Sequence, residues 1–354
     1  MPGERVELRQ SGLAAAPFNE RVLSVQNLSV DMHLREGILH AVQGVSFHVD
    51  RGETLCIVGE SGCGKSLTAL ALMDLLPAGA RRSSGQLEFL GRDLTCLSPR
   101  ELEDLRGDRI AMIFQDPMTS LNPSYTIGTQ LEEVLRRHRR VSPSVARSRA
   151  IELCERVGLT PAVQRLSQYP HQMSGGLCQR AMIAMALMCE PALVIADEPT
   201  TALDVTHQAQ ILRLLASLQR DYRLALILIT HDLGIVAQVA TRVMVMYAGQ
   251  IVETAAAAEL LRAPCHPYTR GLLDCLPGGR TTVPGSRLGT LPGTLPTLFD
   301  RPTGCHFADR CPLVLDACRA EPVALERRAG SDREVRCVRA GESAAMVSAS
   351  EPAR

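Results

Sequence analysis

Nine consecutive residues in the first quarter of the chain have the composition and spacing of a phosphate-binding loop. They are Gly59, Glu60, Ser61, Gly62, Cys63, Gly64, Lys65, Ser66 and Leu67. The first eight match the pattern G-x-x-x-x-G-K-[ST], which lies between a short apolar run, 55–58, and an apolar helix expected over 67–76. Glycines let backbone N–H groups turn toward phosphate oxygens, and the positive end of the next helix favours the same anion.

Two side chains of this loop would act on the bound group directly. Lys65 would reach the β- and γ-phosphates, and the hydroxyl of Ser66 would ligate Mg²⁺. The alternative is an ordinary glycine turn with a surface lysine. The flanking strand and helix favour the phosphate loop.

A second candidate group is a pair of carboxylates at the end of the apolar run 192–198. Asp197 would hold Mg²⁺ through water, and Glu198 would polarise the attacking water as a general base. Such a pair by itself often only marks a strand end that reaches solvent. Together with the phosphate loop it predicts a nucleotide hydrolase.

The elements that must position these residues follow an alternating pattern. Residues 22–34 and 40–49 are expected to be antiparallel strands. Further strands are expected at 55–58, 109–115, 192–198 and 224–230, separated by helical stretches, which predicts a mainly parallel sheet with crossover helices. The periodicity over 128–157 indicates a helical insertion that continues to about residue 189. Residues 242–254 read as a hairpin that turns at Ala248-Gly249.

The composition excludes several classes of protein. The 354 residues correspond to about two domains, and 45% apolar and 21% charged residues are ordinary for a globular chain. The 38 basic and 38 acidic residues balance and aromatic residues make up only 3%, so we expect no nucleic-acid partner. The apolar runs are too short to span a bilayer, and the polar N-terminus lacks a secretory signal. Twelve cysteines in such a chain indicate a reducing cytosol.

Further motifs make the sequence resemble an ABC transporter nucleotide-binding subunit over about residues 22–340. In chain order they are Gln115 in FQDPMTSLNP, like a Q-loop; Ser174-Gly175-Gly176-Leu177-Cys178-Gln179, like the ABC signature; Thr201-Ala202-Leu203-Asp204, like a D-loop; and His231 in ITHD, like a switch histidine. A finer resemblance is to the ATPases of oligopeptide, dipeptide and nickel importers. It rests on FQDPMTSLNP, IADEPTTALDVT, ITHDLG, MYAGQIVE, HPYTRGLL at 266–273 and GCHFADRCP.

This resemblance implies an α/β fold with a P-loop NTPase (RecA-like) core sheet. Antiparallel N-terminal strands, a helical subdomain at about 116–190 and a small cysteine-containing C-terminal extension would complete it. The implied boundaries are an N-terminal tail (1–21), an ABC nucleotide-binding domain (22–262), an oligopeptide-transporter-type extension (263–340) and a disordered tail (341–354).

The implied activity is hydrolysis of ATP to ADP and phosphate, with Mg²⁺, to energise import of di- or oligopeptides. The implied partners are a second ATPase subunit (a paralogue rather than an identical chain), two transmembrane permease subunits and an extracytoplasmic solute-binding protein. The chain would lie peripherally on the cytoplasmic face of the cell (inner) membrane. Two alternatives stay open: the same machinery moving nickel or another small solute, and, from a different class, a soluble ABC-type ATPase of DNA repair or translation.

The resemblance also assigns roles to single residues. Gln115 would ligate Mg²⁺ or position water, and His231 would orient the attacking water and γ-phosphate. Ser174, Gly175 and Gly176, with Asp204 at the same interface, would complete the ATP site of the other ATPase subunit. From the residues alone, Ser174 is a candidate N-cap for an apolar helix over 177–189, and the glycines would let a phosphate approach the helix end. An ordinary glycine helix start and polar strand-end residues remain the plain alternatives.

One segment departs from the family pattern. Family members place an aromatic residue before the second strand to stack on adenine, whereas residues 33–40 contain no Phe, Tyr or Trp. Arg35 or a histidine could stack there instead.

Four cysteines follow a segment, 277–304, in which 11 of 28 residues are Pro or Gly and which should be a loop. They are Cys305, Cys311, Cys318 and Cys337, separated by 5, 6 and 18 residues. Four thiolates can hold a [4Fe–4S] cluster or a tetrahedral Zn²⁺, and the lack of a C-x-x-C pair argues against a zinc ribbon. Some dipeptide importer ATPases carry an iron–sulfur cluster in a similar tail. Plain reduced cysteines are the third alternative.

Overall fold

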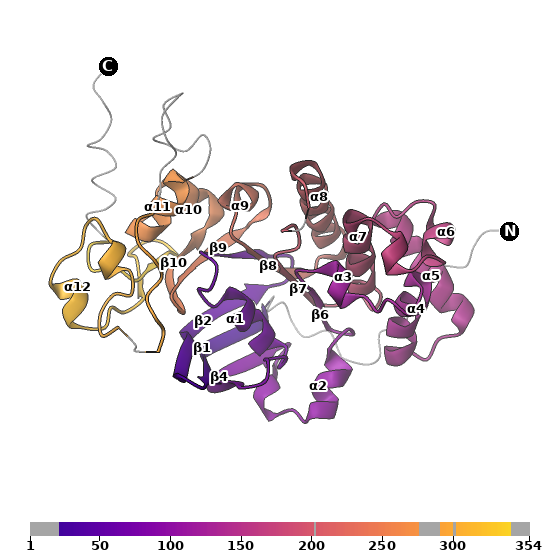
Figure 1. Ribbon diagram of the computed structural model, residues 1–354, viewed down its shortest axis with the longest axis horizontal. Coiled ribbons are helices and arrows are strands. Elements are labelled where there is room, and N and C mark those ends of the chain that lie inside the picture. The colour runs from indigo at the N-terminus through magenta and orange to yellow at the C-terminus, as the bar shows by residue number, and fades with distance from the viewer. Residues whose placement is uncertain (1–20, 202, 276–290, 300–301, 341–354) are drawn as a thin grey trace, which may run out of the picture.

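The computed structural model describes residues 21–201, 203–275, 291–299 and 302–340 (Figure 1). Residues 1–20 of the expected N-terminal tail (1–21), the expected tail at 341–354, Ala202 and most of the expected loop at 277–304 lie outside the described residues. Arg21, the last residue of the expected N-terminal tail, begins a strand. Within the described parts of the chain, no helix is long and apolar enough to cross a membrane.

The central sheet has the strand order β11-β12-β10-β9-β3-β8-β7-β6. Five neighbouring strands are parallel, which confirms the expected parallel core: β9 (Arg242–Tyr247), β3 (Thr54–Val58), β8 (Ala225–Thr230), β7 (Leu193–Asp197) and β6 (Ile110–Ile113). Every residue of β3, β7 and β8 is buried. Their uninterrupted apolar runs reflect the fact that both faces of a parallel sheet are covered.

The expected hairpin at 242–254 is confirmed. β9 and β10 (Gln250–Ala256) pair antiparallel. The turn residues Ala248 and Gly249 have φ of 46° and 80°. Two left-handed residues are what a tight hairpin turn requires.

A second, antiparallel sheet has the order β2-β1-β4-β5. Its strands are β1 (Arg21–Leu34), β2 (Gly37–Asp50), β4 (Ala80–Phe89) and β5 (Arg92–Asp93). The pairing of β1 with β2 confirms the prediction. The sequence did not indicate β4, because only its last residues, Leu87 and Phe89, are buried and the rest is polar. Side chains from both sheets share one hydrophobic core.

The crossover helix after the phosphate loop, α1 (Lys65–Leu72), is shorter than expected. The chain leaves the helix at Met73, and Asp74 has a φ of 51°, which a continuing helix does not allow. In the described parts of the chain, the other α-helices outside the insertion are α2 (Pro99–Leu105), α8 (Val205–Tyr222), α9 (Leu233–Val239), α10 (Ala257–Arg262), α11 (Pro267–Asp274) and α12 (Ala317–Ala320).

The helical insertion lies between β6 and β7, which are neighbours in the sheet. It contains α3 (Pro117–Ser120), α4 (Ile127–His138), α5 (Pro143–Arg156), α6 (Ala162–Leu166) and α7 (Gly175–Ala186). Figure 1 shows these helices grouped at one end of the molecule. Their apolar faces meet at Leu131, Leu153 and Ile183, as the helical periodicity indicated.

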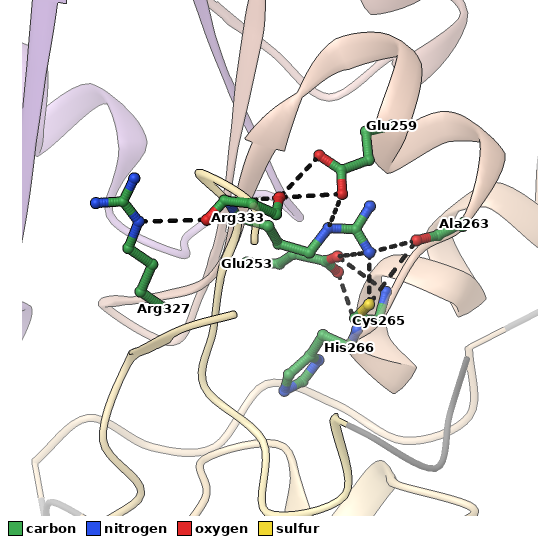
Figure 2. Close-up of polar contacts among 8 residues, drawn as sticks. Glu253, Glu259, Ala263, Cys265, His266, Arg327 and Arg333 are labelled. Carbon is green, nitrogen blue, oxygen red and sulfur yellow. Dashed lines mark hydrogen bonds and ion pairs between the residues drawn. The ribbon is translucent and has the colours of Figure 1, made fainter. Parts of the chain in front are cut away.

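The C-terminal extension is joined to the other end of the sheet. β12 (Glu334–Val335) pairs with β10, and β11 (Glu326–Arg327) pairs with β12. Beside them Arg333 forms ion pairs with Glu253 and Glu259, and Glu253 accepts N–H bonds from Cys265 and His266 (Figure 2). The side chains of Arg333 and Glu253 are 5% and 0% exposed. A buried ion pair of this kind fixes two segments together, because either charge alone would be costly to bury.

Candidate nucleotide site

The phosphate loop runs from the end of β3 to the start of α1, at the carboxyl edge of the parallel strands. Two of its glycines cannot be replaced without a clash. A Cβ on Gly59 would lie 2.2 Å from the carbonyl oxygen of Met246, and one on Gly64 would lie 2.6 Å from that of Ala41. Gly64 also has a φ of 102°. Gly64 is the N-cap of α1 and provides no side-chain hydrogen bond to the first N–H groups of the helix. These N–H groups can therefore bind an anion such as phosphate.

The side chain of Lys65 lies within the loop and is almost fully buried. Its Nζ donates to the carbonyl oxygens of Gly59 at 2.9 Å and Glu60 at 3.0 Å. Burial raises the pKa of the neighbouring Cys63 thiol, so this cysteine stays neutral. Lys65 is the basic side chain of the loop.

Ser66 and Asp197, which lie 131 residues apart in sequence, meet at this edge. The Ser66 hydroxyl donates to Oδ1 of Asp197 at 3.0 Å. Burial raises the pKa of the Asp197 carboxyl, and the hydrogen bond from Ser66 opposes this shift. A hydroxyl and a carboxylate side by side are hard oxygen donors of the kind Mg²⁺ prefers, so the donor set fits the expected metal.

Glu198 is the point at which the expected catalytic residues converge. Its Oε2 lies 3.5 Å from Nε2 of Gln115 and 3.4 Å from Nδ1 of His231. It also accepts a 2.8 Å hydrogen bond from Oγ1 of Thr201, which the sequence placed only in the D-loop motif. Glu198 has a φ of 44°, and a left-handed glutamate is a strained conformation of the type found at functional sites.

The first residues of the signature, Ser174 and Gly175, are exposed, whereas Cys178 and Gln179 are buried. Ser174 N-caps α7, as expected, but its hydroxyl makes no capping hydrogen bond. A Cβ on Gly175 would meet no heavy atom within 4 Å, and one on Gly176 would contact His207. Asp204 N-caps α8 and lies 2.6 Å from Nδ1 of the same His207. In Figure 1, α7 stands apart from α1, so this chain presents the phosphate loop and the signature as two surfaces.

The C-terminal extension reaches the phosphate loop, which the sequence did not indicate. Arg310 forms an ion pair with the carboxylate of Glu60, and the hydroxyl of Tyr268 accepts the backbone N–H of Glu60 at 2.9 Å. The segment that lacks an aromatic residue also has a neighbour from the extension. A Cβ on Gly37 would lie 3.7 Å from the ring of Phe299.

Cys305, Cys311, Cys318 and Cys337 line one cavity of the extension, together with Phe307 and His266. Burial, with smaller contributions from the other three cysteines, raises the pKa of the Cys305 thiol to about 11. Burial also raises the pKa of Cys311 and Cys337. Among the described residues, no group of three or more His, Cys, Asp or Glu side chains has a metal-binding arrangement. The geometry therefore brings the four thiols to one place but gives the metal prediction no further support.

Comparison with known proteins decides the family. A family model described as ABC transporter matches residues 42–201, and one described as oligopeptide/dipeptide transporter, C-terminal region, matches residues 252–318. The dipeptide transport ATP-binding protein DppD of Bacillus subtilis is 52% identical over 300 residues, which cover 84% of this chain and 89% of the relative. The chain belongs to the family of ABC transporter ATP-binding proteins.

Other relatives agree with this ABC assignment. The DppD protein of Escherichia coli is 49% identical over 89% of this chain and 96% of its own length, and the oligopeptide transport protein AppD of B. subtilis is 46% identical over the same shares. Among solved structures, a dimeric post-hydrolysis state of the ATP-binding cassette MJ0796 with ADP and Pi matches with a TM-score of 0.60 and 27% identity. It covers 66% of this chain and 98% of the cassette. These matches confirm the expected fold class and identify the chain as an ABC-type ATPase.

Proposed function

We propose that this ABC ATPase hydrolyses ATP to drive import of di- or oligopeptides through a membrane permease, from the cytoplasmic face of the membrane. The observation that carries the proposal is the convergence of Ser66 with Asp197, and of Gln115 and His231 on Glu198, beside one phosphate loop. The peptide assignment is supported by relatives named for dipeptide and oligopeptide transport. The nickel-import and soluble-ATPase alternatives have no comparable support.

In the proposed site, the backbone of the phosphate loop and Lys65 hold the phosphates of ATP. Ser66 and Asp197, with Gln115, would hold Mg²⁺, which neutralises phosphate charge when bound. Glu198 accepts the proton of the attacking water, and His231 orients that water. Catalysis then comes mainly from positioning and from charge neutralisation.

The proposed site needs a second ATPase subunit. Ser174, Gly175 and Asp204 are exposed and Gly176 is half-buried, and the hydroxyl of Ser174 makes no capping hydrogen bond at the start of this 12-residue helix. Such a helix start suits the γ-phosphate of ATP held by another chain. The dimeric cassette with ADP and Pi is a solved example of two such chains together. A paralogue, two permease subunits and a solute-binding protein would complete the assembly.

The function is tested on the membrane assembly that is purified through an affinity tag on this chain. We expect permease subunits to copurify, and a peptide-loaded binding protein to raise ATP turnover severalfold after reconstitution. The same binding protein without peptide is the control. Stimulation by a nickel complex and not by peptides would favour the first alternative, and recovery of a soluble chain stimulated by DNA would favour the second.

We also propose that Cys305, Cys311, Cys318 and Cys337 bind a [4Fe–4S] cluster that braces the extension. The support is their position around one cavity with an apolar wall that includes Phe307. Cysteine side chains bind iron as thiolates, so cluster formation would release the protons that burial favours on Cys305, Cys311 and Cys337. Zinc is the alternative occupant for the same four sulfurs.

Anaerobically purified protein should contain about four iron atoms and four sulfides per chain and should be brown. Cys311→Ser should lower the iron content by more than half, whereas Cys96→Ser should not, because Cys96 is an exposed cysteine far away in sequence from the extension. Protein with one zinc atom per chain would assign the sulfurs to zinc. Metal-free protein that keeps its normal thermal stability would contradict both metals.

A further inference from the structure

Arg310 links the C-terminal extension to the phosphate loop. Its Nη1 and Nη2 donate to the two carboxylate oxygens of Glu60 at 2.8 and 3.0 Å. The two residues are 250 positions apart in sequence. Two parallel bonds between a guanidinium and a carboxylate fix the carboxylate in both distance and direction.

The guanidinium of Arg310 is itself held in place by its surroundings. Its Nε donates to the carbonyl oxygen of Pro292 at 2.7 Å, and Nη1 lies 3.3 Å from the hydroxyl of Tyr247. Its carbon Cζ lies 5.6 Å from the centre of the Tyr247 ring and 6.0 Å from that of Phe307, within the range of cation–π attraction. The side chain is 5% exposed. A buried arginine with these contacts has little freedom to leave Glu60.

Glu60 transmits this constraint to the nucleotide site. It is the second residue of the phosphate loop, its carbonyl oxygen accepts a bond from Lys65, and its N–H donates to the hydroxyl of Tyr268. Tyr268 belongs to α11, beyond the end of β10, and is fully buried. The extension therefore holds both the side chain and the backbone of this loop residue.

The charge of Glu60 gives a second reason for the contact. A carboxylate in a loop that binds phosphates repels the ligand, and the Glu60 side chain, which is 27% exposed, is only partly screened by water. Arg310 neutralises that carboxylate at close range. Without Arg310, Glu60 would keep its negative charge beside the phosphates or turn into the loop.

We propose that Arg310 is a positioning residue of the ATP site, which acts through Glu60 to shape and neutralise the phosphate loop. The C-terminal extension is then part of the nucleotide site and not only an appendage of the sheet. The inference rests on the nucleotide site proposed above.

The test is MgATP affinity of the purified full-length chain, measured by displacement of a fluorescent ATP analogue. Arg310→Gln should weaken MgATP binding about tenfold, because the loop loses a fixed partner and regains a bare carboxylate. Arg310→Lys keeps the positive charge but loses the two parallel hydrogen bonds of the guanidinium to Glu60, and it should weaken MgATP binding about threefold. Adding Glu60→Gln to Arg310→Gln removes the unpaired carboxylate and should restore the affinity to within threefold of the wild type.

Arg333→Gln is the matched control. Arg333 belongs to the same extension and is equally buried, but it pairs with Glu253 and Glu259 at the β10 edge (Figure 2). If Arg310 only docks the extension, both substitutions should weaken MgATP binding alike; we expect Arg333→Gln to change it less than twofold. Equal effects, an unchanged affinity in Arg310→Gln, or no recovery in the double variant would overturn the proposal.

A variant that fails to fold and a wild-type chain that fails to bind MgATP have different meanings. Thermal unfolding is recorded for each variant, and if Arg310→Gln does not fold, Arg310→Lys decides in its place. A threefold loss in Arg310→Lys then supports the proposal, and a loss below twofold overturns it. A wild-type chain that binds no MgATP would refute the nucleotide site itself, and with it the inference drawn from it.

Discussion

Replacing Glu198 by Gln should lower ATP hydrolysis by roughly 10²- to 10⁴-fold while MgATP still binds with near-normal affinity. General-base catalysis contributes about this much, and an amide cannot take the proton of the attacking water. The amide oxygen of the variant can still accept the hydrogen bond from Thr201 that holds the side chain, which is 2.8 Å long in the native protein. The fold of the loop should therefore survive while the chemistry stops.

The measurement is single-turnover hydrolysis by the assembled transporter, together with MgATP binding. Glu190→Gln is the matched control because it makes the same chemical change three residues before β7, where Glu190 pairs with Arg149 at the surface. We expect the control to retain normal turnover. If Glu198→Gln kept more than about a tenth of the native rate, another group would be the base and the proposed site would be wrong on its main point.

Lys65→Ala should weaken MgATP binding by roughly 10- to 100-fold, because hydrogen bonds to charged groups contribute about 1.5–3 kcal/mol each. Lys65 is the only lysine in the 354-residue sequence, in which arginine otherwise supplies the basic side chains. An ammonium is a compact point charge, whereas the planar guanidinium is larger and binds as a fork. Lys65→Arg should therefore bind ATP poorly as well, although it keeps the charge.

The single lysine also allows a direct measurement of this contact. An amine-specific acylating reagent can modify only Lys65 and the amino terminus, and mass spectrometry can follow the two separately. MgATP should protect Lys65 in proportion to its occupancy and should leave the amino terminus unprotected. Equal labelling of Lys65 with and without saturating MgATP would show that the ammonium does not meet the phosphates.

The local features of this site were predictable from the sequence because each has its own pattern. The uninterrupted apolar runs of β3, β7 and β8 predicted buried parallel strands, and their carboxyl ends placed Ser66 and Asp197 at one edge. The family resemblance placed Gln115 and His231 at the attacking water, but it did not indicate that both side chains lie beside Glu198. In the structure Ser66 contacts Asp197, and Gln115 and His231 lie beside Glu198, the next residue in the chain.

The contacts made by the extension were not predictable in this way. Arg310 precedes a cysteine in a stretch without periodicity, and nothing in its neighbours points to Glu60, 250 residues away. Such a pairing depends on how β12 and α11 dock on the sheet, which only tertiary structure specifies. The position of the Phe299 ring beside Gly37 is also a tertiary contact and was not predictable. The strand β4 was missed for a different reason, because most of its residues are polar and give no alternating apolar pattern.

Uptake of a labelled dipeptide by proteoliposomes tests the central claim most directly. The vesicles hold the purified assembly, with this chain and MgATP inside and the peptide-loaded binding protein outside. The account predicts accumulation of the dipeptide that needs internal ATP and is abolished by Glu198→Gln. Accumulation that proceeds equally without ATP or with the Glu198→Gln chain would contradict it.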